Sequence, residues 1–119
     1  MARAIYNREF DVVICGGGVS GCTAAIAAAR SGASVLVIEQ NGYLGGSLTA
    51  CGVGPMMTFH AGEKQVIRGI MQELVDALRQ TGSTAMSGPL LGFDIEEMKL
   101  LLDRKLRQSG AELLLHTVF

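Results

Sequence analysis

Apolar residues along this chain form two patterns, short unbroken runs and stripes at helical spacing. Residues 10–15 and 34–38 are short runs rich in β-branched side chains, which is typical of strands buried on both faces of a sheet. Between them, the alanine-rich segment 19–30 predicts a helix that ends at Ser31-Gly32. This order of strand, glycine turn, helix and strand predicts a right-handed crossover between two parallel strands.

Two further helices and a closing strand are predicted in the second half of the chain. One apolar stripe precedes Gly82 and consists of Val66, Ile67, Ile70, Met71, Leu74 and Leu78. Asp94 and Glu97 resemble a capping box, and the stripe that follows them ends before Gly110 and consists of Ile95, Met98, Leu101, Leu102 and Leu106. Residues 81–92 are predicted to be a polar linker, and residues 112–118 a strand.

Residues 40–64 show no period of 2 or 3.6 and contain many glycines. Such a long excursion inside a compact domain is usually functional. The chain as a whole is therefore predicted to be an α/β domain with a parallel sheet and flanking helices.

Composition excludes several classes of function. The chain has 119 residues, of which 49% are hydrophobic and 18% charged, enough for one domain with a core. Ten basic against eleven acidic residues, with no basic run, exclude nucleic acid as the main partner. No apolar run approaches the roughly 20 residues that a membrane helix needs, so we expect no membrane span.

The N-terminus and the cysteines predict a cytoplasmic location. Charged residues from Arg3 onward, with no apolar run or cleavage site after them, indicate that a secretory signal is absent. Cys15, Cys22 and Cys51 are an odd set without Cys-x-x-Cys spacing, which argues against a disulfide framework or a zinc site. We interpret them as buried or incidental thiols.

The candidate chemistry lies in the glycine turn after the first strand. Gly16, Gly18 and Gly21 form the pattern G-x-G-x-x-G between a strand and a helix. The first glycine permits the tight turn, the second lets backbone approach a pyrophosphate, and the third lets helix and strand pack closely. Glu39 ends the second strand, where a carboxylate binds ribose hydroxyls. The competing structural interpretation is a turn that only packs a helix on a sheet.

The segments 11–25, 32–39 and 45–55 resemble the N-terminal part of FAD-dependent oxidoreductases of the glutathione-reductase-like superfamily. The resemblance implies an enzyme whose bound FAD exchanges hydride or electrons with a small-molecule substrate. It implies a Rossmann-like fold, here an incomplete FAD/NAD(P)-binding domain, because family members continue into further strands and a substrate domain. Residues 1–119 are thus expected to be the N-terminal part of that domain. An uncovered sheet edge predicts homo-oligomer formation or instability.

The same resemblance implies a set of cofactor-binding residues. The pyrophosphate is assigned to Gly16, Gly18, Val19, Ser20 and Gly21, and the ribose to Glu39 and Gln40. The pyrophosphate and the flavin end are assigned to Gly45, Gly46, Ser47 and Thr49, and the adenine to the backbone of Thr117 and Val118. Cys15 and Cys22 are expected to be structural.

The sequence leaves the roles of three other residues undecided, and it allows two alternative functions. Cys51 and His60 are predicted to lie near the flavin, with His60 more simply a solvated loop residue, and His116 is predicted to be packed or paired in the last strand. No catalytic residue and no substrate is predicted. The alternatives are an inactive nucleotide-binding fragment, or an NAD-binding Rossmann module, which a crossover helix within residues 40–64 would favour.

Overall fold

The computed structural model describes residues 7–87 and 90–119. The expectation about a secretory signal depends partly on residues 1–6, and the predicted linker includes residues 88 and 89. Both of these parts lie outside the described residues. Among the described residues, no helix combines the length and the apolar character needed to cross a bilayer.

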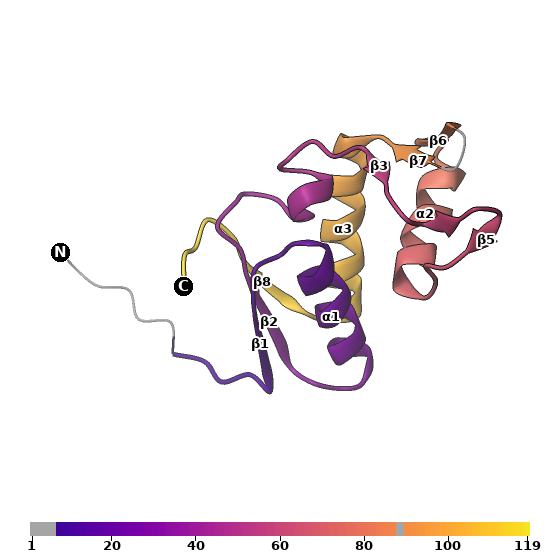
Figure 1. Ribbon diagram of the computed structural model, residues 1–119. Helices are drawn as coiled ribbons and strands as arrows, with labels where there is room; N and C mark the ends of the chain where they lie inside the picture. Colours follow the sequence, from indigo (N-terminus) through magenta and orange to yellow (C-terminus); the bar gives the residue numbers. More distant parts are fainter. Residues whose placement is uncertain (1–6, 88–89) are drawn as a thin grey trace.

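A three-stranded parallel sheet carries the predicted crossover. Its order is β1 (Val12–Cys15), β2 (Val35–Ile38) and β8 (Glu112–Leu114). α1 (Val19–Arg30) joins β1 to β2, and α3 (Ile95–Ser109) leads into β8. Figure 1 shows α1 and α3 side by side on one face of this sheet. The predicted parallel α/β fold with flanking helices is confirmed.

The other face of the sheet is only partly covered. β2 is buried on both faces as expected, but β1 is not, since Val13 is 50% exposed and Cys15 is also exposed. Val12 and Ile14 alternate with these residues and pack into the core. The prediction that β1 is buried on both faces is therefore wrong, because an apolar run cannot reveal which face another element covers.

The N-terminal segment links the two outer strands of the sheet. Arg8, just before β1, donates two hydrogen bonds to the carboxylate of Glu112 in β8, one of them at 2.6 Å. Its guanidinium also lies 5.1 Å from the centre of the Phe10 ring. Asp11 accepts hydrogen bonds from the backbone N–H and the hydroxyl of Ser34. Residues 104 positions apart are thus joined across the amino ends of the strands.

A second layer is formed by the segment between β2 and α3. It contains the 3₁₀ helix η1 (Gly46–Leu48), the helix α2 (Ile70–Gln80) and two small antiparallel sheets. One sheet has the order β3-β7-β6, made of Pro55–Met56, Leu90–Phe93 and Thr84–Ser87. The other pairs β4 (His60–Ala61) with β5 (Lys64–Gln65). Residues 40–64 hold no crossover helix, so the condition that would favour an NAD module is not met.

Three predicted boundaries are corrected. α2 begins at Ile70 and not at Val66, because Gly69 before it adopts a φ of 68°, which an α-helix does not contain. The segment predicted as a linker, residues 81–92, contains β6 and most of β7. These strands pair with each other, and β7 also pairs with β3. The polar sequence of the segment gives no sign of this backbone pairing. The last strand ends at Leu114, and His116 has a φ of 52° that turns the chain away from the sheet. The prediction that His116 lies in a strand is therefore wrong.

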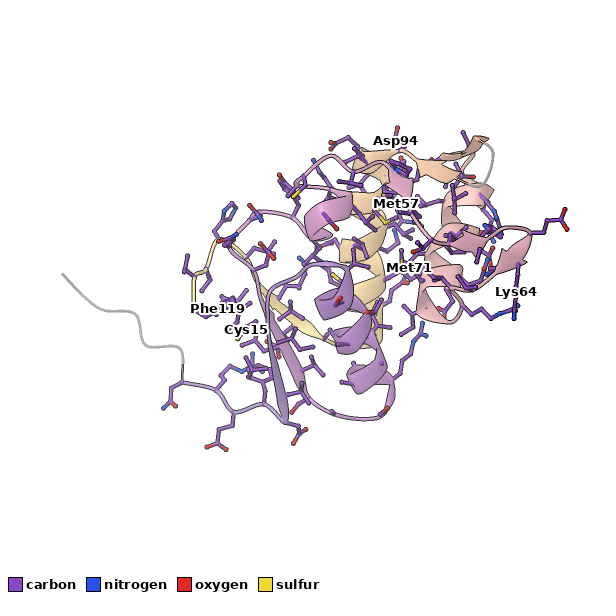
Figure 2. The ribbon with its side chains drawn as sticks, in the orientation of Figure 1. Cys15, Met57, Lys64, Met71, Asp94 and Phe119 are labelled. Atoms are coloured by element: carbon purple, nitrogen blue, oxygen red, sulfur yellow. The ribbon has the colours of Figure 1, made fainter. Side chains whose placement is uncertain are left out.

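The start of α3 follows its predicted cap. Asp94 accepts hydrogen bonds from the backbone N–H groups of Glu96 and Glu97, at 2.9 and 3.0 Å. The backbone N–H of Asp94 itself donates to Ser83, and so ties α3 to the end of α2. Figure 2 shows Asp94 where α3 meets the β3-β7-β6 sheet.

We expect Asp94→Ala to lower the free energy of unfolding by about 1 kcal/mol, because two first-turn N–H groups lose their acceptor. Asp94→Ser should retain most of the stability. Asp103→Ala, which removes only an exposed ion pair with Arg107, is the control and should have a smaller effect. Urea denaturation measures all three variants. Equal stability of Asp94→Ala and the wild type would show that the cap contributes nothing.

Candidate functional site

Two glycines in the turn between β1 and α1 are required by the fold itself. Gly16 has a φ of 104°, a conformation that other residues rarely adopt. At Gly21, a Cβ atom would lie 2.0 Å from the backbone oxygen of Gly16. These observations confirm the expected roles of the first and third glycines in turning the chain and in packing the helix closely.

Gly18 differs from both of them. Its φ is −68°, which suits any residue, and a Cβ atom placed on it would meet no protein atom within 4 Å. It is also the N-cap of α1, and no side chain among the described residues caps that helix. The first N–H groups of α1 therefore face a space that the protein leaves open, an arrangement suited to an anion.

The second glycine segment lies directly against this turn. Gly45 donates its N–H to the carbonyl oxygen of Gly17 at 2.8 Å, and Gly18 and Gly45 form an isolated β-bridge. A Cβ on Gly46 would lie 3.0 Å from the Cα of Gly18. Two segments predicted separately from the sequence are thus brought together by backbone contact. Ser47, on η1, is exposed beside them.

Thr49 has a different environment from its predicted neighbours. It is buried, and its hydroxyl donates to the carbonyl oxygen of Leu44 at 2.6 Å. A Cβ on Gly45 would lie 2.5 Å from the Thr49 methyl carbon. The Thr49 side chain therefore holds the glycine segment in place.

Glu39 is buried at the end of β2, with 6% of its surface exposed. One carboxylate oxygen accepts from the N–H of Gly17 at 2.7 Å. The other accepts from the backbone N–H and the side-chain amide of Asn41, both at 2.8 Å. These bonds satisfy the buried charge and fix the position of the carboxylate relative to the glycine turn.

A cavity of about 290 Å³ lies next to Glu39 at the carboxyl end of the sheet. It is lined by Gly16, Glu39, Gln40, Val118 and Phe119. The C-terminal segment is fixed there because Thr117 donates its N–H to the backbone oxygen of Glu39 at 3.0 Å. Ligands of open parallel sheets bind in this position.

Sequence reasoning missed two residues of the site, Gly17 and Asn41. A Cβ on Gly17 would lie 2.4 Å from the Cδ2 atom of Leu44, which would have to move, so the close approach of the 44–46 segment favours glycine there. The available signal was the run of three consecutive glycines, of which the motif uses only two. For Asn41, the signal was a short polar side chain two residues after the acidic end of a strand.

The three cysteines lie in different environments. Cys22 is fully buried in α1, and burial raises the pKa of its thiol to about 12. Its Sγ atom also lies 3.2 Å from the Gly17 oxygen and donates to it. Cys15 and Cys51 are exposed, and Figure 2 shows Cys15 on the side of the sheet away from α3. The described residues include no group of three or more metal-ligating side chains.

The two histidines differ from their predicted environments. His60 lies in β4 with its ring 5.2 Å from that of Phe59, and its Nδ1 atom is buried without a partner among the described residues. The prediction of a solvated loop histidine is therefore wrong. His116 is exposed outside the last strand, and its ring lies over Gly42, where a Cβ would approach within 2.7 Å.

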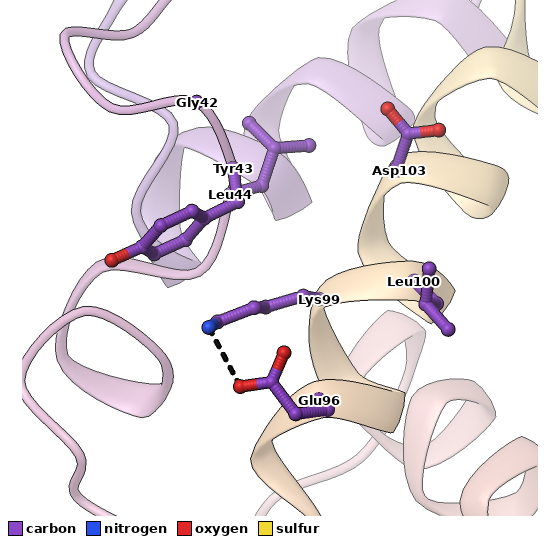
Figure 3. A pocket seen from close by; sticks show the side chains of 7 residues that line it. All are labelled: Gly42, Tyr43, Leu44, Glu96, Lys99, Leu100 and Asp103. Carbon is purple, nitrogen blue, oxygen red and sulfur yellow. Dashed lines mark hydrogen bonds and ion pairs between the residues drawn. The ribbon is translucent and has the colours of Figure 1, made fainter.

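A second cavity, of about 350 Å³, lies between the 42–44 loop and α3 (Figure 3). Its charged groups are already paired within the protein. Lys99 donates to Glu96 at 2.8 Å and lies 4.2 Å from the centre of the Tyr43 ring. Asp103 accepts from Arg107 at 2.9 Å. These internal pairs leave no free charge to recognise a ligand.

Comparison with known proteins identifies what the chain is similar to. Residues 11–119 match the family model described as FAD dependent oxidoreductase. A thiamine thiazole synthase of Aeropyrum pernix is 34% identical over 112 residues, which cover 87% of this chain and 36% of that protein. A soluble pyridine nucleotide transhydrogenase of Marinomonas is 40% identical over 61 residues, or 51% of this chain and 13% of that protein.

Solved structures show the same fold. The glycine oxidase of Geobacillus kaustophilus superposes with a TM-score of 0.63 at 13% identity, over 90% of this chain and 46% of that one. THI4 of Thermovibrio ammonificans superposes with a TM-score of 0.59 at 23% identity, over 89% and 38%. The chain thus spans less than half the length of each of these proteins.

We expect two of the three cysteines to react quickly with a thiol reagent such as 5,5′-dithiobis(2-nitrobenzoate) at pH 8. Cys15 and Cys51 are exposed, whereas Cys22 is buried with its pKa raised to about 12, so its reactive thiolate is nearly absent. Cys22 should react only after unfolding in guanidinium chloride. Cys22→Ala should leave the fast phase unchanged. Rapid reaction of all three thiols in the folded protein would contradict the buried position of Cys22.

Proposed function

The chain belongs to the FAD dependent oxidoreductase family, and from this premise we propose that residues 1–119 form the N-terminal part of the FAD-binding domain of a flavin-dependent oxidoreductase. FAD is the cofactor of the family. Bound FAD supplies the exchange of hydride or single electrons with a substrate, and the protein binds and orients it. The substrate is a small molecule of unassigned identity, and no residue is assigned as catalytic.

The observation that carries the proposal is the open space at Gly18. The fold explains glycine at positions 16, 17 and 21, either by a positive φ or by a contact that a Cβ atom would violate. It does not explain glycine at position 18, where a Cβ would meet nothing within 4 Å. A pyrophosphate approaching the backbone at this point supplies the missing constraint. The residues present therefore fit the cofactor.

The proposed contacts divide the site into three parts. Gly16, Gly18, Val19, Ser20 and Gly21 bind the pyrophosphate through backbone at the start of α1, with support from Gly45, Gly46 and Ser47. Glu39 and Gln40 bind the adenosine ribose at the cavity that they line with Val118 and Phe119. The backbone of Thr117 and Val118 faces the adenine. Thr49 acts through the glycine segment that its side chain holds.

Cellular location and assembly complete the proposal. The exposed thiols of Cys15 and Cys51 are unpaired, the state that the reducing cytoplasm maintains, so we place the protein there. Unless a further part of the protein covers them, the open edge and the exposed face of β1 favour self-association. Cell fractionation tests the first of these statements, and light scattering tests the second.

We expect Gly18→Ala to weaken FAD binding by about tenfold or more and to change the free energy of unfolding by less than about 1 kcal/mol. Its methyl group occupies space that the fold leaves empty and that the pyrophosphate needs. Gly21→Ala is the matched variant. It should unfold about 1–3 kcal/mol more easily, because its Cβ would overlap the Gly16 carbonyl.

Titration of FAD by flavin fluorescence, together with thermal unfolding, measures both effects. Unchanged FAD affinity in Gly18→Ala would remove the pyrophosphate assignment. A wild-type protein that binds NAD and refuses FAD would overturn the proposed function itself.

The assignment of Glu39 predicts a difference between FAD and FMN, because FMN lacks the adenosine ribose. We expect Glu39→Ala to weaken FAD binding by about 1.5–3 kcal/mol more than FMN binding, the range for hydrogen bonds to a charged group, because loss of the bond to Gly17 affects both ligands alike. Glu112→Ala, which removes an exposed carboxylate far from the cavity, is the protein control. Calorimetric titration with each ligand gives the two affinities. An equal loss for FAD and FMN would mean that Glu39 acts only by holding Gly17 and Asn41.

A further inference from the structure

A groove between α1 and α2 belongs to none of the assigned contacts. It is a shallow groove of about 520 Å³ that is widely open to solvent. Five of its lining residues are apolar and two carry hydroxyls, and the full set is Val19, Ser20, Thr23, Ala24, Ala27, Arg68, Ile70 and Met71. Figure 2 shows Met71 between the two helices.

Arg68 is the one charged residue among the described residues that line this groove. It takes part in none of the ion pairs or hydrogen bonds of the described chain. Glu73, the acidic residue in the first turn of α2, is already held by Arg30 through two hydrogen bonds at 2.7 and 2.8 Å. Arg68 is exposed, so its guanidinium is hydrated and has no partner within the described chain, in contrast to the lysine of the cavity in Figure 3, which is bonded to Glu96.

The surroundings of Arg68 define the chemistry of a complementary ligand. A planar guanidinium binds a carboxylate through two parallel hydrogen bonds. The remaining wall is apolar, since Ala24 and Ala27 leave the surface of α1 low and Ile70 and Met71 line the opposite side. Thr23 directs its hydroxyl to the backbone oxygens of Val19 and Ser20, which leaves Arg68 as the charged anchor.

We propose that this groove binds an organic acid, whose carboxylate pairs with Arg68 and whose apolar part lies along α1. The site goes beyond the proposed function, because it requires no bound FAD. Two residues that line the groove, Val19 and Ser20, are also proposed pyrophosphate contacts. An acid bound in the groove therefore lies next to the cofactor site.

Octanoate is a suitable probe, and octanamide, which has the same chain without the charge, is its neutral counterpart. NMR titration of the ¹⁵N-labelled full chain should give saturable shifts at Arg68, Ala24 and Ala27 with octanoate. Octanoate should bind about tenfold more tightly than octanamide, because a hydrogen bond to a charged group distinguishes the two ligands. Equal affinities, or shifts centred elsewhere, would overturn the proposal.

Variants test the two halves of the groove separately. Arg68→Met should weaken octanoate binding about tenfold and leave octanamide unchanged, and Arg68→Lys should have an intermediate effect. Ala27→Leu, which fills the apolar wall, should weaken both ligands. Arg104→Met removes an exposed α3 arginine that does not line the groove, and should change neither. Thermal unfolding confirms that each variant is folded. Wild-type octanoate affinity in Arg68→Met would contradict the site.

Parallel titration with FAD separates this proposal from the proposed function. We expect Arg68→Met to bind FAD as the wild type does. Loss of FAD with retention of octanoate would assign Arg68 to the dinucleotide and overturn the acid site. A wild-type protein that binds octanoate at Arg68 but not FAD would leave the acid site intact and refute the proposed function.

Discussion

The candidate site depends on two hydrogen bonds made by the backbone of Gly17. Its N–H donates to the buried Glu39 carboxylate, and its carbonyl oxygen accepts from Gly45. One residue thereby fixes the turn after β1 to the end of β2 and to the 45–46 segment. A Cβ on Gly17 would overlap the end of the Leu44 side chain, so this double attachment favours glycine. Gly18, the next residue, is thereby held beside Gly45.

The parts of the fold that could be predicted are those that depend on residues close together in the sequence. The β1-α1-β2 unit follows from two apolar runs and an alanine-rich helix, and α3 follows from its stripe between Asp94 and Gly110. The site was predictable to the same extent, since a glycine motif and an acidic strand end are local patterns. Family resemblance assigned both Gly18 and Gly45 to the pyrophosphate, but their contact was not predicted, because no spacing in the chain encodes a contact between separate turns.

The elements that were missed depend on partners distant in the sequence. β6 and β7 carry no alternating pattern, and they are strands because their backbone pairs with each other and with β3. Likewise, the exposure of Val13 depends on which elements cover β1, and the sequence of β1 does not contain that information. His60 shows the same limit, since a loop composition gave no sign that its Nδ1 atom would be buried.

The strand order has a consequence for how the chain acquires its structure. β2 is the central strand, yet one of its two partners, β8, begins 74 residues after β2 ends. The Arg8–Glu112 pair spans a still longer stretch. Contacts of such large sequence separation require costly loop closure, and they form late in folding. The backbone groups along one side of β2 therefore remain without strand partners at least until residue 114 has been synthesised. Until then, the nascent chain carries an unpaired strand edge, the kind of surface that makes folding intermediates prone to aggregation.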